Sequence, residues 1–185
     1  MLTWLVIAIM AAIGLVLLCT YVMKSSPARW DLYFTQHAAG SPVIWQTIAR
    51  LSDPLLMVLY AFILAGILCC QGCFQSAIWV LVTLGITDGV GIWLKRLVRR
   101  SRPAAVRAHY SFPSGHVLGA TVMALLLLSL YRTLWLHLLV IIIWLLIATS
   151  RLFLKAHYLS DILGAICLAI CVFSLSMIMI ILLLV

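Results

Sequence analysis

Three short clusters of polar side chains stand out in a chain that is otherwise apolar. The first cluster, residues 95–103, reads KRLVRRSRP. The second, residues 113–116, reads PSGH, and the third, residues 150–161, reads SRLFLKAHYLSD. Together they supply cations, two imidazoles, a carboxylate and the start of a helix. Groups of these types are suited to chemistry on a phosphoryl group.

The cations and the helix start predict an oxyanion site. An arginine can contact a phosphate through two parallel hydrogen bonds, and a lysine adds a compact charge. A helix that starts at Ser114 and Gly115 offers unpaired backbone N–H groups and the positive end of its dipole. We therefore expect Lys95, Arg102 and Arg151 to bind phosphate together with this helix start.

The two histidines allow separate roles in catalysis. His157 and Asp161 are four residues apart, so they can face each other on a helix or at its start. Asp161 would then fix the tautomer of His157 and stabilise its charged form, which makes His157 the expected nucleophile. His116 has no such partner in the sequence and suits the general acid. This is electrostatic catalysis, and we expect no metal and no cofactor.

The composition excludes a soluble globular protein. Of the 185 residues, 66% are hydrophobic and only 9% are charged, whereas a soluble domain averages about 25% charged residues. Mean hydropathy is +1.26. Disorder, collagen, a coiled coil and a secreted disulfide scaffold are excluded too, and so is a nucleic-acid binder, despite the net charge of +8. The sequence predicts one polytopic membrane domain over residues 1–185.

Six apolar segments predict an all-α bundle of six transmembrane helices with both termini on the same side. We expect the spans at residues 2–23, 54–71, 74–94, 115–131, 134–150 and 161–184. Asp53 followed by Pro54 predicts a helix start, and Gly72 predicts a tight turn. Residues 24–53 mix aromatic and basic side chains, which suits the lipid headgroup region.

The charges gather at one membrane face. The connections after the first, third and fifth spans share a side, and they hold eleven of the twelve Lys and Arg residues. The active site is therefore expected at that face. For Arg99, Arg100 and Arg107 the sequence leaves two interpretations open: they are solvated, or they attract anionic lipid headgroups. His109 is expected to be an exposed loop residue.

Asp88 is expected inside the third span, where an acid is costly and by default suggests a function. We favour a structural role, as a hydrogen-bonding group within the bundle. The spacing of Gly85 and Gly89 predicts close helix packing at this point.

The three clusters resemble the type-2 phosphatidic acid phosphatase superfamily. The family pattern is K-x6-RP, then PSGH, then SR-x5-H-x3-D, and this chain matches it at every defining position. The resemblance implies a phosphohistidine on His157, protonation of the leaving group by His116, and support of the nucleophile by Asp161. It also implies phosphate binding by a further set of residues: Lys95, Arg102, Ser114, Gly115 and Arg151.

The resemblance further implies a small bacterial lipid phosphatase of the phosphatidylglycerophosphatase B or undecaprenyl diphosphate phosphatase type. The expected partners are the membrane lipids and a lipid phosphate substrate, with undecaprenyl diphosphate slightly favoured over phosphatidylglycerophosphate; phosphatidate is a third substrate of this kind. Two alternatives remain open: phosphotransfer to a hydroxyl acceptor, and a non-catalytic transport or assembly protein. The intact pair of His157 and Asp161 argues against the second.

Two arguments disagree on the sidedness of the site. The positive-inside rule places the face with eleven cations in the cytoplasm. The family resemblance places the active site outside the cytoplasmic membrane, with both termini inside. We follow the resemblance, and expect a multi-pass protein of a bacterial cytoplasmic membrane with an extracytoplasmic site.

Overall fold

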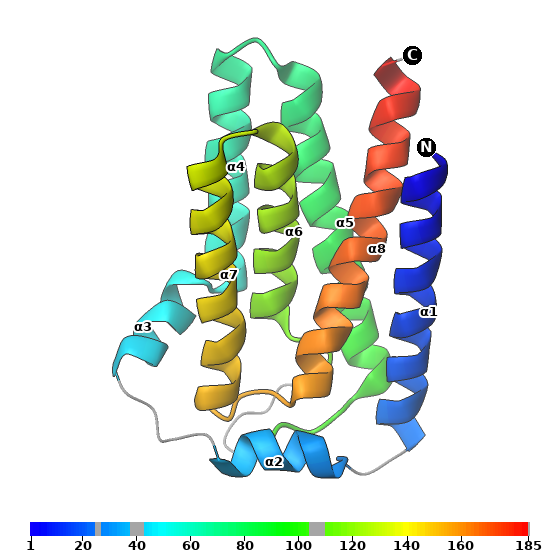
Figure 1. The fold of residues 1–185 in the computed structure, drawn as a ribbon, viewed down its shortest axis with the longest axis vertical. Helices are drawn as coiled ribbons and strands as arrows, with labels where there is room; N and C mark the ends of the chain where they lie inside the picture. The colour runs from blue at the N-terminus through cyan, green and yellow to red at the C-terminus, as the bar shows by residue number, and fades with distance from the viewer. Residues whose placement is uncertain (25–26, 38–42, 104–109, 185) are drawn as a thin grey trace.

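The protein, as a computed structural model, is described for residues 1–24, 27–37, 43–103 and 110–184. Within these ranges all of its regular secondary structure is helical (Figure 1). The helices are α1 (Leu2–Lys24), α2 (Arg29–His37), α3 (Val43–Leu51), α4 (Pro54–Cys70), α5 (Phe74–Val98), α6 (Gly115–Leu130), α7 (Leu134–Phe153) and α8 (Leu159–Leu184). The predicted all-α membrane fold is confirmed.

Each of the six expected spans contains an apolar helix, but their lengths differ. Helices α1, α5, α7 and α8 are long and apolar enough to cross a membrane. Helix α4 reaches that length only together with α3, from which it is bent by 49°. Helix α6 has 16 residues, about 24 Å at 1.5 Å per residue, against a hydrocarbon layer of about 30 Å. In the described ranges, four or five segments are therefore of full spanning length.

Two of the local signals in the sequence act as expected. The Asp53 side chain accepts a hydrogen bond from the backbone N–H of Leu55 at 3.0 Å, and Pro54 occupies the first turn of α4. Gly72 turns the chain between α4 and α5 with a φ of +77°, a conformation that glycine adopts at little cost. The first feature starts α4, and the turn at Gly72 lets α5 run back along α4.

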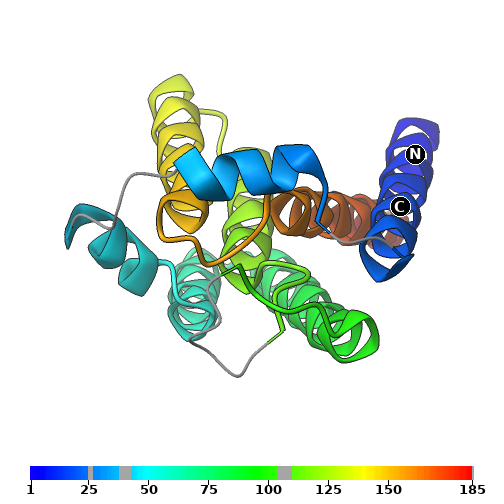
Figure 2. The same cartoon turned by 90° about the horizontal axis from the view of Figure 1, so that it is seen from below.

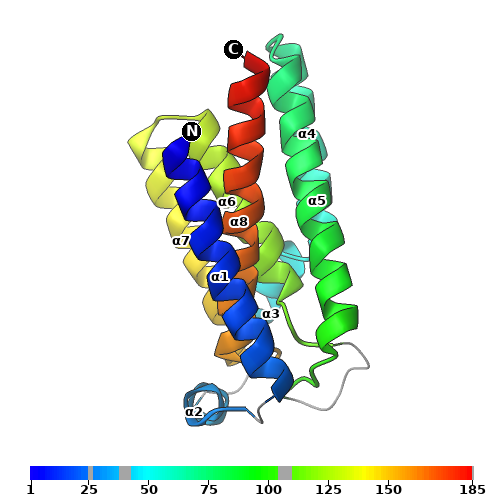
Figure 3. The same ribbon diagram turned by 90° about the vertical axis from the view of Figure 1, so that its right-hand side faces the viewer.

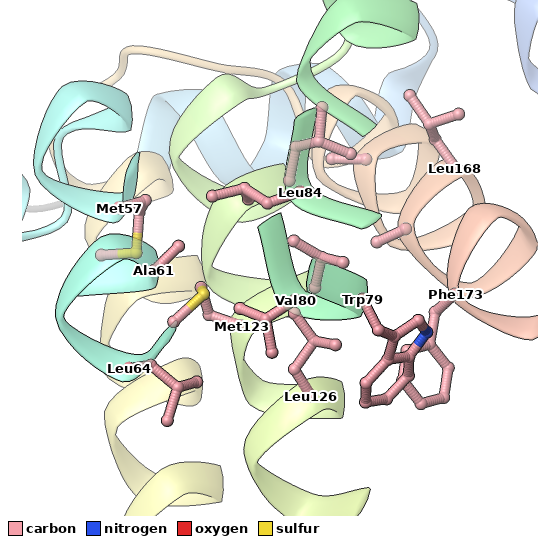
Figure 4. Close-up of a cluster of buried hydrophobic side chains, with 14 of the residues drawn as sticks. Met57, Ala61, Leu64, Trp79, Val80, Leu84, Met123, Leu126, Leu168 and Phe173 are labelled. Carbon is pink, nitrogen blue, oxygen red and sulfur yellow. The ribbon is translucent and has the colours of Figure 1, made fainter. Parts of the chain in front are cut away.

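Helix α6 lies at the centre of the bundle and packs against α4, α5, α7 and α8. Figure 4 shows the apolar cluster around it, with Leu64 from α4, Trp79 and Val80 from α5, Leu126 from α6 and Phe173 from α8. The outer surfaces are apolar as well, since α1 and α7 expose many large hydrophobic side chains. An apolar exterior over an apolar core is what a lipid environment requires.

The polar stretch after α1 forms two short helices that the sequence did not predict. Helix α2 lies across one end of the bundle (Figure 2), and Figure 3 shows it in cross-section at that end. Helix α3 packs against α7, where Trp45 stacks on Phe153 with ring centroids 4.7 Å apart. Aromatic side chains on both helices suit the membrane–water interface, as expected from the sequence.

The end covered by α2 is where the polar clusters meet. It holds the C-terminal ends of α5 and α7 and the N-terminal ends of α6 and α8, whereas both chain termini lie at the opposite end (Figure 1). Helix α5 continues to Val98, four residues beyond the expected span, so Lys95 lies on its last turn. Arg99 then ends the helix in a left-handed conformation with a φ of 50°.

The predicted close helix packing at Gly85 and Gly89 is wrong. Both glycines are exposed, and a Cβ atom added to either would meet nothing within 4 Å. They face away from the bundle because the buried positions of this part of α5 are occupied by Thr83, Leu84 and Thr87. Their spacing therefore does not identify a contact within this chain.

A different glycine is needed for packing at the site end. A Cβ atom at Gly164 of α8 would overlap the ring of Phe112, which is fully buried just before the PSGH segment. We expect Gly164→Ala to lower the free energy of unfolding by about 1–3 kcal/mol, the usual cost of overpacking. Gly66→Ala on α4 is the matched control, because nothing lies within 4 Å of the added atom.

Thermal unfolding of both variants in detergent checks this expectation. Gly164→Ala should melt several degrees below the wild type, and Gly66→Ala at or near the wild-type temperature. Equal melting temperatures for the two variants would contradict the packing described for Phe112.

Candidate active site

The link between α7 and α8 places His157 against Asp161. Nδ1 of the histidine lies 3.5 Å from Oδ2 of the aspartate, and the backbone N–H of Tyr158 donates to the same oxygen at 3.0 Å. Both side chains are buried. Contacts of this kind are often long without substrate and tighten on binding. Because Nδ1 faces Asp161, Nε2 is the nitrogen that a substrate can approach.

Burial lowers the pKa of His157 below its usual value, since a charged imidazole is poorly solvated there. Asp161 opposes this shift, whereas the positive charges of Arg102 and Lys95 add to it. The net direction keeps the imidazole neutral at neutral pH, which is the form that can attack phosphorus.

The PSGH segment is tied to this pair through the backbone. The N–H of Ser114 donates to the carbonyl oxygen of Asp161 at 3.1 Å, so the start of α6 and the start of α8 are held together. Ser114 is the N-cap residue of α6, yet its side chain makes no capping hydrogen bond. Its hydroxyl is buried without a partner in the described structure. A buried hydroxyl of this kind at a helix N-terminus suits an anion.

Gly115 brings the start of α6 close to Lys95. A Cβ atom at Gly115 would lie 3.4 Å from Nζ of Lys95 and 3.4 Å from the ring of Pro54. The ammonium group on the last turn of α5 therefore lies next to the N-terminus of α6. A positive charge and a helix N-terminus here face the same small space.

The remaining predicted residues lie in the same region. His116 is half-buried on the first turn of α6 and interacts electrostatically with Arg151, His157, Lys95 and Arg102. Arg151 is buried on the last turn of α7, where its Nε donates to Ser150 at 3.1 Å. The structure thus brings together all eight residues that the sequence predicted for the site, although their roles stay predictions.

Arg100 corrects the sequence interpretation. It is neither solvated nor free to attract headgroups: its side chain is buried and lies within ion-pair distance of two carboxylates. One nitrogen lies 2.7 Å from Oδ1 of Asp161 and the other 2.7 Å from Oδ2 of Asp31. The guanidinium also stacks over the ring of Tyr158 at 4.1 Å. Burial opposes the charge, but the two carboxylates raise the pKa of Arg100 and keep it a cation.

Asp31 is the second residue that sequence reasoning missed. It comes from α2 and is fully buried. The one feature of the sequence that could have pointed to Asp31 is that acidic residues are rare, since the chain has just four. Asp31 lies in a polar stretch and is not part of any of the three motifs.

The other polar residues whose role the sequence did not decide lie in different environments. Arg99 is exposed and bonds back to the carbonyl of Arg96 at 2.9 Å, whereas Arg107 and His109 lie outside the described residues. Asp88 is half-buried and interacts electrostatically with Lys95. Among the described side chains, no group of three His, Cys, Asp or Glu residues is arranged to hold a metal ion.

A family model described as the PAP2 superfamily matches residues 76–182, more than half of the chain and all three motifs. The chain belongs to the PAP2 superfamily. Membership supports phosphatase chemistry for the site described above.

A solved structure shares the fold. It is described as the first transmembrane PAP2 type phosphatidylglycerolphosphate phosphatase from Bacillus subtilis, and it matches with a TM-score of 0.73 at 20% sequence identity. The match covers 93% of this chain and 94% of that one. Among curated proteins, none matches the chain in sequence.

The geometry predicts that the site binds inorganic phosphate without any lipid. A ligand that binds only the folded state at 100 times its Kd stabilises it by about 2.7 kcal/mol, so phosphate should raise the melting temperature of the purified protein. Lys95→Ala removes the ammonium group beside Gly115 and should abolish most of this rise. Arg96→Ala is the matched control, because Arg96 is the exposed next residue of the same helix turn. An equal rise in both variants would argue against phosphate binding at Lys95.

Proposed function

We propose that this protein is an integral-membrane phosphatase that hydrolyses a phosphate or diphosphate monoester carried by a lipid, through a phosphohistidine on His157. The observation that carries the proposal is the arrangement at the α2 end of the bundle. A neutral histidine backed by a buried carboxylate faces the region of Lys95, Arg102 and Arg151. Membership in the PAP2 superfamily supports the same chemistry.

In the first step, Nε2 of His157 attacks the terminal phosphorus. The bond from that phosphorus to the leaving oxygen breaks; this is the lipid oxygen in a monophosphate and the bridging oxygen in a diphosphate. Once the negative phosphate is bound beside it, His116 carries a proton, which it gives to the departing oxygen. Asp161 stabilises the positive charge that develops on the imidazole, as a carboxylate does in a catalytic triad. Lys95, Arg102 and Arg151, with the N-terminus of α6, stabilise the negative charge on the equatorial oxygens.

In the second step, water attacks the phosphohistidine. His116, now neutral, accepts a proton from this water, the bond from phosphorus to Nε2 breaks, and inorganic phosphate leaves. Apart from the attacking water, both steps use only groups of this chain, and each returns His116 to the form that the other step needs. This is why we propose a reaction without a metal ion.

An apolar cavity supports a lipid as the carrier of the phosphate. It has a volume of about 570 Å³, within the usual range for small-molecule sites, and it is lined by residues of α3, α4, α6 and α7. Met57 of α4 lines it, only three residues after Pro54, the residue that faces Gly115. A hydrocarbon chain attached to a phosphate at Gly115 would therefore have apolar space within reach.

The candidate substrates are undecaprenyl diphosphate, phosphatidylglycerophosphate and phosphatidate. The motif residues address the phosphate rather than the chain, so all three fit the same site. The activity named for the similar Bacillus subtilis protein adds support for phosphatidylglycerophosphate.

We place the protein in a bacterial cytoplasmic membrane with the site on its outer face, following the family resemblance. The positive-inside rule opposes this placement. Its force is reduced, because four of the eleven cations at that face lie in the site or are buried beside it: Lys95, Arg100, Arg102 and Arg151.

The test is phosphate release from these three lipids by the purified protein in detergent, with EDTA present. The wild type should release phosphate from at least one, and His157→Ala should lower kcat by about 10³-fold or more, as removal of a nucleophile does. His137→Ala is the matched control: it lies on the first turn of α7 and bonds to the carbonyl of Tyr131, with no link to the site.

Three outcomes would contradict the proposal: a need for a divalent metal, full activity in His157→Ala, or binding of the lipids without turnover. The last would favour a transport or assembly protein. A phosphorylated acceptor in place of free phosphate would favour phosphotransfer, in which a hydroxyl replaces water in the second step.

A further inference from the structure

Asp31 is buried although it belongs to a helix that lies on the outside of the bundle. Helix α2 crosses the end of the bundle next to the start of α8 (Figure 2), and three of its side chains, Trp30, Tyr33 and Phe34, are exposed. Among the side chains of α2 that the structure describes, Asp31 is the only buried one, with an exposed fraction of 0%. A buried carboxylate is stable only when it is paired and hydrogen-bonded, so its partners indicate its role.

The first set of partners is the start of α8. Oδ1 of Asp31 accepts a hydrogen bond from the backbone N–H of Ser160 at 3.0 Å, and Oδ2 accepts one from its hydroxyl at 2.7 Å. The first N–H groups of a helix lack partners within the helix, and a capping residue just before it normally supplies them. Here the capping carboxylate comes from a residue 129 positions away. Asp31 therefore fixes the turn of α8 that carries Asp161.

The second partner is Arg100. Its guanidinium lies between two carboxylates, with Nη2 donating to Asp31 and Nη1 donating to Oδ1 of Asp161, each at 2.7 Å. The same Nη1 also donates to the hydroxyl of Ser160 at 2.6 Å. Because the guanidinium is planar and its donors are fixed relative to one another, holding one side of it orients the other.

We propose that Asp31 is a positioning residue for phosphoryl transfer: by capping α8 and holding Arg100, it fixes the carboxylate of Asp161 against His157. This inference rests on the function proposed above. Arg100 occupies Oδ1 of Asp161, which leaves Oδ2 for Nδ1 of His157 and the N–H of Tyr158. Without Asp31, both Arg100 and Ser160 lose an acceptor, and the carboxylate of Asp161 is free to turn away from the histidine.

The expected signature is a change in kcat rather than in KM. Asp31 binds Ser160 and Arg100, and neither of these is one of the predicted phosphate-binding residues. Loss of orientation should therefore weaken the stabilisation of the charged imidazole in the transition state and leave substrate binding largely intact. Loss of a group that orients a metal-ligating histidine typically lowers activity by about 10–100-fold, and we expect an effect of similar size for this nucleophile.

The experiment compares Asp31→Asn and Asp31→Glu with the wild type, on whichever lipid phosphate the wild type hydrolyses. We expect kcat to fall by about 10–100-fold in Asp31→Asn and by less in Asp31→Glu, which keeps the charge. KM and the rise in melting temperature with phosphate should stay close to the wild-type values in both. Asp53→Asn is the matched control, because Asp53 is an acid at the same end of the bundle that caps only its own helix.

A double-mutant cycle with Arg100→Met separates positioning from a general loss of folded protein. If Asp31 acts through Arg100, adding Asp31→Asn to Arg100→Met should lower kcat much less than it does in the wild type. Should Asp31→Asn not be recovered folded, Asp31→Glu carries the test, with a reduced kcat and normal phosphate stabilisation as the expected result.

The inference is overturned by an unchanged kcat in the Asp31 variants, by an equal fall in Asp53→Asn, or by independent effects of Asp31 and Arg100. A kcat that falls only in proportion to the loss of phosphate-stabilised protein overturns it as well. Failure of the proposed function is distinguishable, since it would appear as a wild type that hydrolyses none of the lipids.

Discussion

The negative charge of Asp161 is buried completely, and the rest of the site depends on how that charge is stabilised. Its side chain accepts from Arg100 and from the N–H of Tyr158, and it faces Nδ1 of His157. Its backbone carbonyl holds Ser114 at the start of α6. Removing one partner of a buried ion pair typically costs about 3–5 kcal/mol. The same residue thus joins the phosphate-binding helix start to the nucleophile.

This constraint also explains why the site spans so many elements. The nucleophile needs a carboxylate, and the carboxylate needs a cation away from water. That cation, Arg100, in turn pairs with a second carboxylate, Asp31, on the interfacial helix α2. In an apolar bundle, each added charge must be neutralised nearby. The outcome is a chain of alternating charges that runs from the surface helix to His157, next to the cations that face the phosphate.

The residues of the site could be predicted from the sequence, whereas the residues that hold them in position could not. Motifs such as PSGH have fixed spacings, so Ser114, His116 and His157 could be identified by pattern alone. Arg100 could not, because in the run RLVRRSR it has no spacing that separates it from its solvated neighbour Arg99. Asp31 is 129 residues from Ser160, and no local rule connects residues so far apart. The prediction of close packing at Gly85 was wrong for a related reason, since the spacing of residues on one helix does not specify which face of that helix meets a neighbour.

In the proposed mechanism, His157 carries the phosphoryl group between the two steps. The most direct measurement is to mix the purified protein with a lipid labelled in its terminal phosphate, quench the reaction with base within milliseconds, and map any label on the protein. A label that is stable in base, lost in acid and located at His157 is the predicted result. Two results would contradict the mechanism. One is release of labelled phosphate with no labelled protein at any time during the first turnover, and the other is an acid-stable label at a serine such as Ser114.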